Sequence, residues 1–147
     1  MTSEEIIKKL PYQDPFLFVD ELHHVSENLV EGTYTLKENE YFYQGHFKEN
    51  PITPGVILTE IMAQIGLVCL GIYLLRESII DEEAGVAMSS TEIQFYKSVL
   101  PGETLTVISE KEYFRFNKLK CNVTLFNAHK VKVAQGIISG MIVPLPS

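Results

Sequence analysis

The feature that most constrains the fold is a run of twenty residues, Val56 to Leu75, in which Glu60 is the only charged side chain. Its length would allow a helix that spans a membrane. Two observations argue against a span. Glu60 and Gln64 lie one helical turn apart on one face, where polar groups are costly in lipid, and no basic cluster flanks either end. The run therefore predicts a helix buried on nearly every side within a protein core.

The start of this helix is marked by Thr53-Pro54-Gly55. Thr53 is typical of an N-cap, and Pro54 suits the first helical position because it lacks an N–H group that would be unpaired there. The N–H groups of Gly55 and Val56 would then be free at the positive end of the helix dipole, where they can hold a polarised carbonyl oxygen. The alternative is an ordinary helix start whose N–H groups meet water.

The segments outside the helix are rich in β-branched and aromatic residues and are separated by turn signals. A short helix is predicted at Ser3–Leu10 with Ser3 as its cap, and a charged loop at Arg76–Glu83. Strands are predicted at Phe16–Val25, Leu29–Leu36, Gly85–Tyr96, Thr104–Phe114, Leu119–Phe126 and Lys130–Val143. This order predicts an α+β fold, in which an antiparallel sheet curves around the helix. Such a sheet has exposed edges, so a homo-oligomer that covers them is expected.

Composition narrows the class of protein. The 147 residues are expected to form one domain, residues 1–147, and the net charge of −7 without a run of Lys or Arg makes nucleic acid a poor partner. Cys69 and Cys121 lie in apolar segments with no CxxC pattern, so reduced, packed thiols are favoured over a disulfide or a metal site. The first fifteen residues lack the apolar core of a secretory signal, and a cytoplasmic location is expected.

A carboxylic acid in an apolar run suggests acid–base chemistry. Burial would favour the neutral form of Glu60, which can then donate a proton. His46, fourteen residues earlier in a loop, can take a proton from carbon, and the helix start can stabilise charge on a carbonyl oxygen. Base, acid and oxyanion donor together suit the removal of water from a 3-hydroxyacyl thioester. The spacing leaves open whether His46 and Glu60 meet within one chain or across a dimer interface.

Four segments carry a resemblance to a known family: LPYQDPFLFVDE at 10–21, QGHF at 44–47, PITPGVILTEIMAQ at 51–64 and FYKSVLPGETL at 95–105. In order and over almost the whole chain, they closely resemble the 3-hydroxyacyl-acyl carrier protein dehydratases of bacterial fatty acid synthesis. The GHF triplet alone is weak evidence for this family. Followed at this spacing by PGV, Glu and MAQ, it is a specific signal.

The resemblance implies the hotdog fold and a dimer, often assembled further into a hexamer, in which His46 of one subunit faces Glu60 of the other. It implies no metal and no organic cofactor, and a 3-hydroxyacyl chain on acyl carrier protein as substrate. By the match, His46 is the base, Glu60 the acid or the residue that holds the transferred water, Gly55 the oxyanion donor beside Val56, and Gln64 the residue that orients Glu60. Glu at position 60, where a related branch has Asp, indicates dehydration without isomerisation of the double bond.

Two groups of side chains have alternative interpretations. An acyl tunnel or ordinary core packing would account for Tyr12, Phe16, Phe47 and Phe95. A docking patch for an acidic carrier protein or scattered surface charge would account for Lys97, Arg115, Lys118 and Lys120.

The chain departs from the family pattern at Tyr12-Gln13, at 48–50 and at 96–98, where the family usually has basic residues, prolines or histidines. These departures favour a specialised pathway, such as polyketide or aryl-polyene pigment synthesis. Two other functions stay open. One is a hotdog acyl thioesterase; the other is a non-catalytic subunit of a hotdog heterodimer, which would be expected to lose His46 or Glu60.

Overall fold

The computed structural model describes residues 1–78 and 84–144, so residues 79–83 of the predicted charged loop lie outside the described residues. The helices are α1 (Ser3–Lys8), a 3₁₀ turn (Tyr41–Gln44), and a central helix made of α2 (Gly55–Ala63), a π-helical turn (Gln64–Cys69) and α3 (Leu70–Leu74). The strands are β1 (Glu21–Val25), β2 (Leu29–Thr35), β3 (Ala84–Phe95), β4 (Thr104–Arg115), β5 (Lys118–Phe126) and β6 (Lys132–Pro144). The predicted order of two strands, one long helix and four strands is confirmed.

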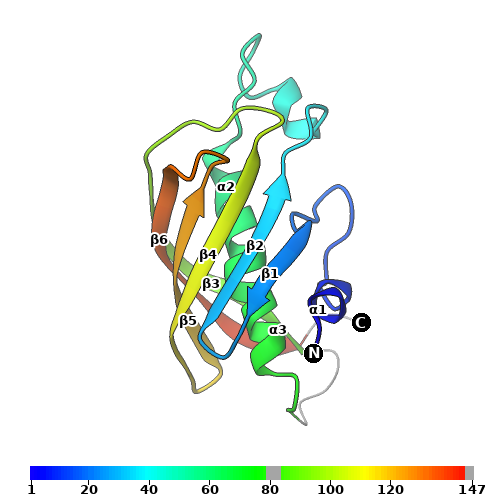
Figure 1. Cartoon of the computed structure of the whole chain (residues 1–147), viewed down its shortest axis with the longest axis vertical. Coiled ribbons are helices and arrows are strands. Elements are labelled where there is room, and N and C mark those ends of the chain that lie inside the picture. The colour runs from blue at the N-terminus through cyan, green and yellow to red at the C-terminus, as the bar shows by residue number, and fades with distance from the viewer. Residues whose placement is uncertain (79–83, 145–147) are drawn as a thin grey trace.

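The six strands form one antiparallel sheet in the order β1-β2-β4-β5-β6-β3. The sheet curves around the central helix, which crosses behind it (Figure 1). This is the hotdog arrangement, and the predicted α+β class is confirmed. Along β5, buried and half-buried residues alternate, because one face packs on the helix and the other faces outward.

The central helix, Gly55–Leu74, is long and apolar enough to cross a membrane, and an 18-residue window within it has a mean hydropathy of 2.0. In the fold, 72% of that window is buried, and every residue from Ile61 to Leu70 is buried. Two glycines let the helix approach the sheet closely. A Cβ at Gly66 would lie 2.9 Å from Val123, and one at Gly71 would lie 2.5 Å from Val86. Apolar packing against the sheet thus accounts for the hydrophobic run.

Two predicted element ends are wrong for local reasons. The cap of α1 is Thr2 instead of Ser3, because the Thr2 hydroxyl accepts from the N–H of Glu5 and the Glu5 carboxylate accepts from the N–H of Thr2. The predicted strand Phe16–Val25 begins only at Glu21. The backbone before it is hydrogen-bonded to a side chain of the central helix, as described below.

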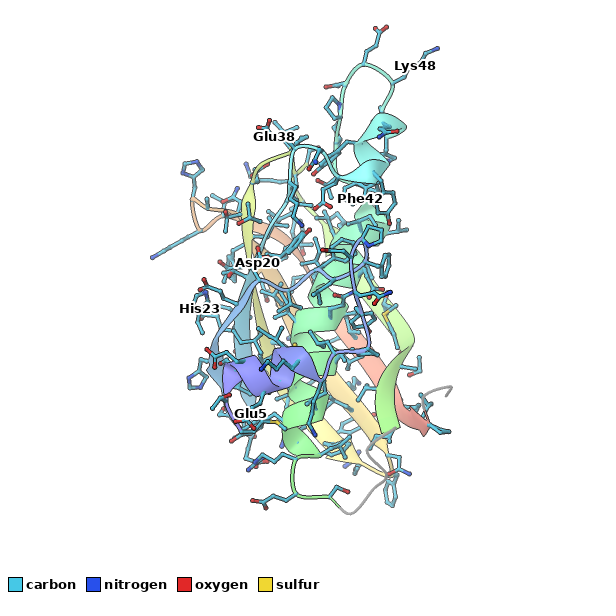
Figure 2. All side chains as sticks on the ribbon, turned by 90° about the vertical axis from the view of Figure 1, so that its right-hand side faces the viewer. Glu5, Asp20, His23, Glu38, Phe42 and Lys48 are labelled. Atoms are coloured by element: carbon cyan, nitrogen blue, oxygen red, sulfur yellow. The ribbon has the colours of Figure 1, made fainter. Side chains whose placement is uncertain are left out.

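The two edges of the sheet differ in length and cover. β1 has five residues, carries a bulge between Leu22 and His24, and has α1 packed beside it (Figure 2). β3 has twelve residues, and those from Ala87 to Glu92 are all exposed. Among residues 1–78 and 84–144, the one strand that pairs with β3 is β6. A long exposed edge offers unpaired backbone groups to another strand, whereas β1 is short and irregular.

Candidate active site

The central helix begins at Gly55, and its N-cap is Pro54 in extended conformation. The prediction of Thr53 as N-cap is wrong. Its hydroxyl instead forms a 2.6 Å hydrogen bond with the hydroxyl of Tyr43, and its backbone N–H donates to the carbonyl of Val99. The hydroxyl and the N–H of Thr53 therefore hold the segment before the helix, and the hydroxyl does not cap the first helical turn.

The first two N–H groups of the helix are open. Ile57 and Leu58 both donate to the carbonyl of Pro54, but no carbonyl among the described residues accepts from Gly55 or Val56. A Cβ at Gly55 would lie 3.6 Å from the ring of Phe95, so the glycine faces that ring directly. These free donors at a helix N-terminus can stabilise a negatively charged oxygen, as the sequence predicts.

Glu60 lies one turn further along the helix, and Gln64 donates a 2.9 Å hydrogen bond from Nε2 to its Oε2. Gln64 is fully buried and Glu60 is half-buried. Burial raises the pKa of Glu60, and the hydrogen bond from Gln64 lowers it by less. The net shift favours the neutral acid relative to an exposed glutamate, in the direction expected for a proton donor.

The amide of Gln64 also binds the chain before β1. Its Oε1 accepts from the N–H of Phe18 at 2.8 Å, and its Nε2 donates to the carbonyl of Phe16 at 3.0 Å. The sequence prediction missed this contact because it placed both phenylalanines in a strand. The nearby Pro11 and Pro15 were the available signal, since proline interrupts regular structure.

Tyr12 belongs to the same N-terminal segment and packs against the core. Burial, followed by the charges of Glu60 and then Cys69, raises the pKa of Tyr12 to about 12. Its phenol therefore stays neutral, and the charge of Glu60 acts on it. Tyr12 was predicted as a tunnel or core residue, and its interaction with the charge of Glu60 was not foreseen.

His46 lies in the loop after the 3₁₀ turn, which projects from one end of the molecule near Lys48 (Figure 2). Its Nδ1 is 2.9 Å from the carbonyl oxygen of Ile52, and its ring stacks on Phe47 with centroids 4.0 Å apart. A carbonyl oxygen can only accept, so Nδ1 carries a proton. In neutral His46 the lone pair is then on Nε2, which is the form required of a base.

The chain does not bring its own His46 and Glu60 together. Among the described residues no hydrogen bond or ion pair joins them, and His46 has no part in the pKa shift of Glu60. Apolar side chains around both remain open: Val56 is 77% exposed, Phe47 54% and Phe95 46%. His46 and Glu60, which the resemblance assigns to one site, are thus apart in this chain, and exposed apolar side chains lie beside each of them.

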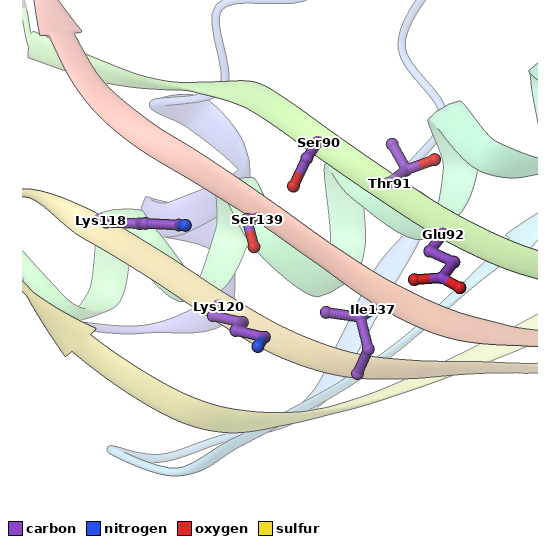
Figure 3. A pocket seen from close by; sticks show the side chains of 7 residues that line it. All are labelled: Ser90, Thr91, Glu92, Lys118, Lys120, Ile137 and Ser139. Carbon is purple, nitrogen blue, oxygen red and sulfur yellow. The ribbon is translucent and has the colours of Figure 1, made fainter.

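A separate hollow of about 250 Å³ lies on the outer face of the sheet, across β3, β6 and β5 (Figure 3). Lys118 and Lys120 line one side of it, beside the hydroxyl groups of Ser90 and Ser139. Lys120 is 3.7 Å from Glu112, whereas no ion pair to Lys118 is found within 1–78 and 84–144. Two of the four predicted basic-patch residues therefore lie side by side.

Comparison with solved structures supports the fold. A Streptococcus mutans UA159 protein solved with acetyl-CoA has a TM-score of 0.67 at 17% identity, covering 94% of this chain and 98% of its own. A hypothetical thioesterase from Streptococcus pneumoniae TIGR4, solved with coenzyme A, has a TM-score of 0.63 at 15% identity, covering 86% and 90%. At these identities the likeness is one of fold.

Comparison of sequences is more specific. Proteins named 3-hydroxyacyl-[acyl-carrier-protein] dehydratase FabZ are 33% identical over 138 residues in Acinetobacter baylyi, covering 94% of this chain and 93% of the relative, and 34% identical over 145 residues in Ehrlichia canis, covering 95% and 93%. The model of the FabA-like domain matches residues 10–138. This chain belongs to the FabA-like domain family.

Proposed function

We propose that this protein removes water from a 3-hydroxyacyl thioester on acyl carrier protein and forms the trans-2-enoyl thioester. The observation that carries the proposal is the position of Glu60, an acid whose pKa is raised by burial, one turn after two free N–H groups at a helix start. The FabZ-named relatives support a place in fatty acid synthesis. The departures at Tyr12-Gln13, 48–50 and 96–98 keep a specialised polyketide or aryl-polyene pathway as the finer alternative.

In the proposed reaction, His46 is the base, Gly55 and Val56 stabilise the oxyanion, and Glu60 is the acid. Nε2 of His46 takes the proton from the α-carbon, and the electron pair left behind moves onto the thioester carbonyl oxygen. The N–H groups of Gly55 and Val56 stabilise that oxygen. As the double bond forms, the C–O bond at carbon 3 breaks, and Glu60 protonates the departing hydroxyl to give water. Return of the proton from His46 to Glu60 restores the starting state.

A homodimer that pairs β3 with β3 of a second copy would complete this site. β3 is the long uncovered edge, and antiparallel pairing about a twofold axis would extend the sheet without leaving that edge open. The partner would also cover Phe47, Val56 and Phe95, which become walls of an acyl tunnel. His46 of one subunit would then face Glu60 of the other, and a trimer of such dimers is the further step.

The basic side chains of the β4–β5 hairpin are the proposed docking site for the carrier protein. Lys118 and Lys120 share the hollow in Figure 3, and Arg115 lies at the end of β4, with its guanidinium 4.4 Å from the Tyr113 ring. Their positive charge complements an acidic carrier. Lys97 follows the end of β3 and does not line this hollow. The proposed enzyme works in the cytoplasm, without metal, organic cofactor, nucleic acid or membrane.

The proposed activity is tested by giving the purified protein 3-hydroxyacyl chains of several lengths on carrier protein. Enoyl product from the wild type, lost in folded His46→Ala and Glu60→Ala, is the expected result. Release of free carrier thiol without enoyl product would favour a thioesterase. Activity that requires a different hotdog chain would favour the partner-subunit alternative.

Mixing the two inactive variants tests the shared site. If His46 and Glu60 act across the interface, each mixed dimer contains one intact pair. Random exchange would then restore about a quarter of wild-type activity. Variants that exchange subunits, as followed by mass spectrometry, but stay inactive would place both residues within one subunit.

A further inference from the structure

The buried amide of Gln64 has only one orientation that satisfies its neighbours. The N–H of Phe18 can only donate, and it lies 2.8 Å from Gln64 Oε1. The carbonyl of Phe16 can only accept, and it lies 3.0 Å from Nε2. Two backbone groups of opposite polarity therefore dictate which end of the amide is oxygen and which is NH₂. The second N–H of that NH₂ group is left to donate to Oε2 of Glu60, 2.9 Å away.

This orientation makes the two oxygens of Glu60 unequal. Oε2 must act as an acceptor in both protonation states, because its neighbour is an N–H donor. In the neutral acid the proton is favoured on Oε1, because the unprotonated oxygen is the stronger acceptor for the Gln64 N–H. Oε1 has no hydrogen-bond partner within the described part of the chain, and because no buried side-chain oxygen there lacks a partner, Oε1 is open to solvent. When that proton leaves, the new charge strengthens the hydrogen bond from Gln64.

We infer that the backbone of Phe16–Phe18 is a positioning element of the active site, which fixes the Gln64 amide and so assigns Oε1 of Glu60 as the oxygen that delivers the proton. This inference rests on the dehydration proposed above. The O–H bond at Oε1 breaks while the substrate C–O bond breaks with its electron pair on oxygen, and the two fragments combine as water. The α-proton remains on His46, so charge and atoms balance.

The other groups near Glu60 do not compete for this role. Tyr12 has a pKa of about 12, and burial raises the pKa of the Cys69 thiol above its ordinary value, so both are neutral near neutral pH. The charged group expected to face Glu60 during turnover is His46 of the second subunit. Burial raises the pKa of Glu60 and Gln64 lowers it. Loss of the Gln64 donor should therefore raise that pKa further.

The first test follows the Glu60 carboxyl carbon, labelled with ¹³C and assigned with Glu60→Gln, by NMR titration. In Gln64→Met the pKa of Glu60 is expected to rise, the alkaline limb of the kcat/KM profile to move to higher pH, and kcat to fall about tenfold. An unchanged carboxyl titration in folded Gln64→Met would overturn the inference. A shifted titration without any dehydration by the wild type would instead overturn the proposed function.

The second test acts on the backbone itself. Semisynthesis of the full chain replaces the N–H of Phe18 by an ester oxygen, which removes the donor to Gln64 and keeps every side chain. The matched control places the ester at Asp20, whose N–H donates to the carbonyl of Thr33 at 2.9 Å. The Phe18 ester is expected to raise the pKa of Glu60 and lower kcat, and the Asp20 ester to do neither. Equal titrations in the two esters would overturn the positioning role.

Discussion

Glu40 is buried and Glu60 is half-buried, and their carboxyl groups differ in their hydrogen-bond partners. Glu40 is only 8% exposed, and its Oε2 accepts two hydrogen bonds, from the Tyr34 hydroxyl at 2.5 Å and from the N–H of Lys37 at 3.3 Å. Glu60 accepts one, from Gln64, on one oxygen. Glu40 is tied to residues close in sequence, whereas Glu60 is oriented through Gln64 by a segment more than forty residues away.

On the proposed mechanism, this difference separates Glu40, which holds the structure, from Glu60, which donates a proton to the substrate. The Tyr34 hydroxyl and the Lys37 N–H both donate to the Glu40 carboxyl, and these hydrogen bonds hold the loop after β2 in place. Their effect is also seen in Tyr34, where burial and then the bond to Glu40 raise the pKa of the phenol above its ordinary value. Glu60 has a raised pKa and one oxygen without a partner. A half-buried acid with a raised pKa and one oxygen open to solvent is a candidate for catalysis.

The largest expected effect is on activity at Glu60. Glu60→Gln keeps the shape of the side chain and an acceptor for Gln64 but has no acidic proton, so dehydration should fall roughly 100- to 10,000-fold. Steady-state kinetics on carrier-bound substrate, with circular dichroism to verify folding, measures this. A fall of less than tenfold would remove Glu60 from the role of proton donor.

Removing a hydrogen-bond donor from Glu40 should affect the stability of the protein instead of its activity. Tyr34→Phe removes the hydroxyl that donates to Glu40 and leaves a buried carboxylate with a weaker set of donors. The free energy of unfolding should drop by about 1–3 kcal/mol, with kcat unchanged for the folded protein. Urea denaturation and kinetics on the same sample test both halves. Loss of activity without loss of stability would make Glu40 a second chemical acid.

A smaller effect is expected on the pH dependence of stability. Because the folded-state pKa of Glu60 lies above its unfolded value, protonation of Glu60 favours folding. That contribution is fully present below about pH 4.5, the ordinary value for glutamate, and is lost as the pH rises through the raised pKa. The Glu60→Gln variant has no carboxyl group at this position, so its stability does not fall as the pH rises through the pKa of Glu60. Its stability relative to the wild type should therefore increase with pH across that window, as followed by denaturation at several pH values.

The sequence predicted the order of strands and helix along the chain, the buried central helix and its start beside Gly55, because hydrophobic periodicity and a Pro-Gly helix start are local signals. The oxyanion role of Gly55 stays a prediction. The sequence also predicted that burial favours the neutral form of Glu60, because Glu60 lies in an apolar run that forms a buried helix. It did not predict the cap of the central helix, because Tyr43 takes the hydroxyl of Thr53 through a tertiary contact. Nor did it predict the hydrogen bonds between the Gln64 side chain and the backbone of Phe16 and Phe18, which lie 48 and 46 residues away.

The position of β3 in the sheet has a consequence for biosynthesis. β3 is made before β4 and β5, yet its one neighbour in the sheet is β6, the strand nearest the C-terminal end. The proposed dimerisation edge thus lacks its sheet neighbour until β6 has been synthesised. Pairing across so long a separation in sequence is slow, so the edge forms late. Subunit assembly should accordingly follow the synthesis of β6, and substitutions that disrupt β6 should release β3 before they disturb β1, β2 and β4.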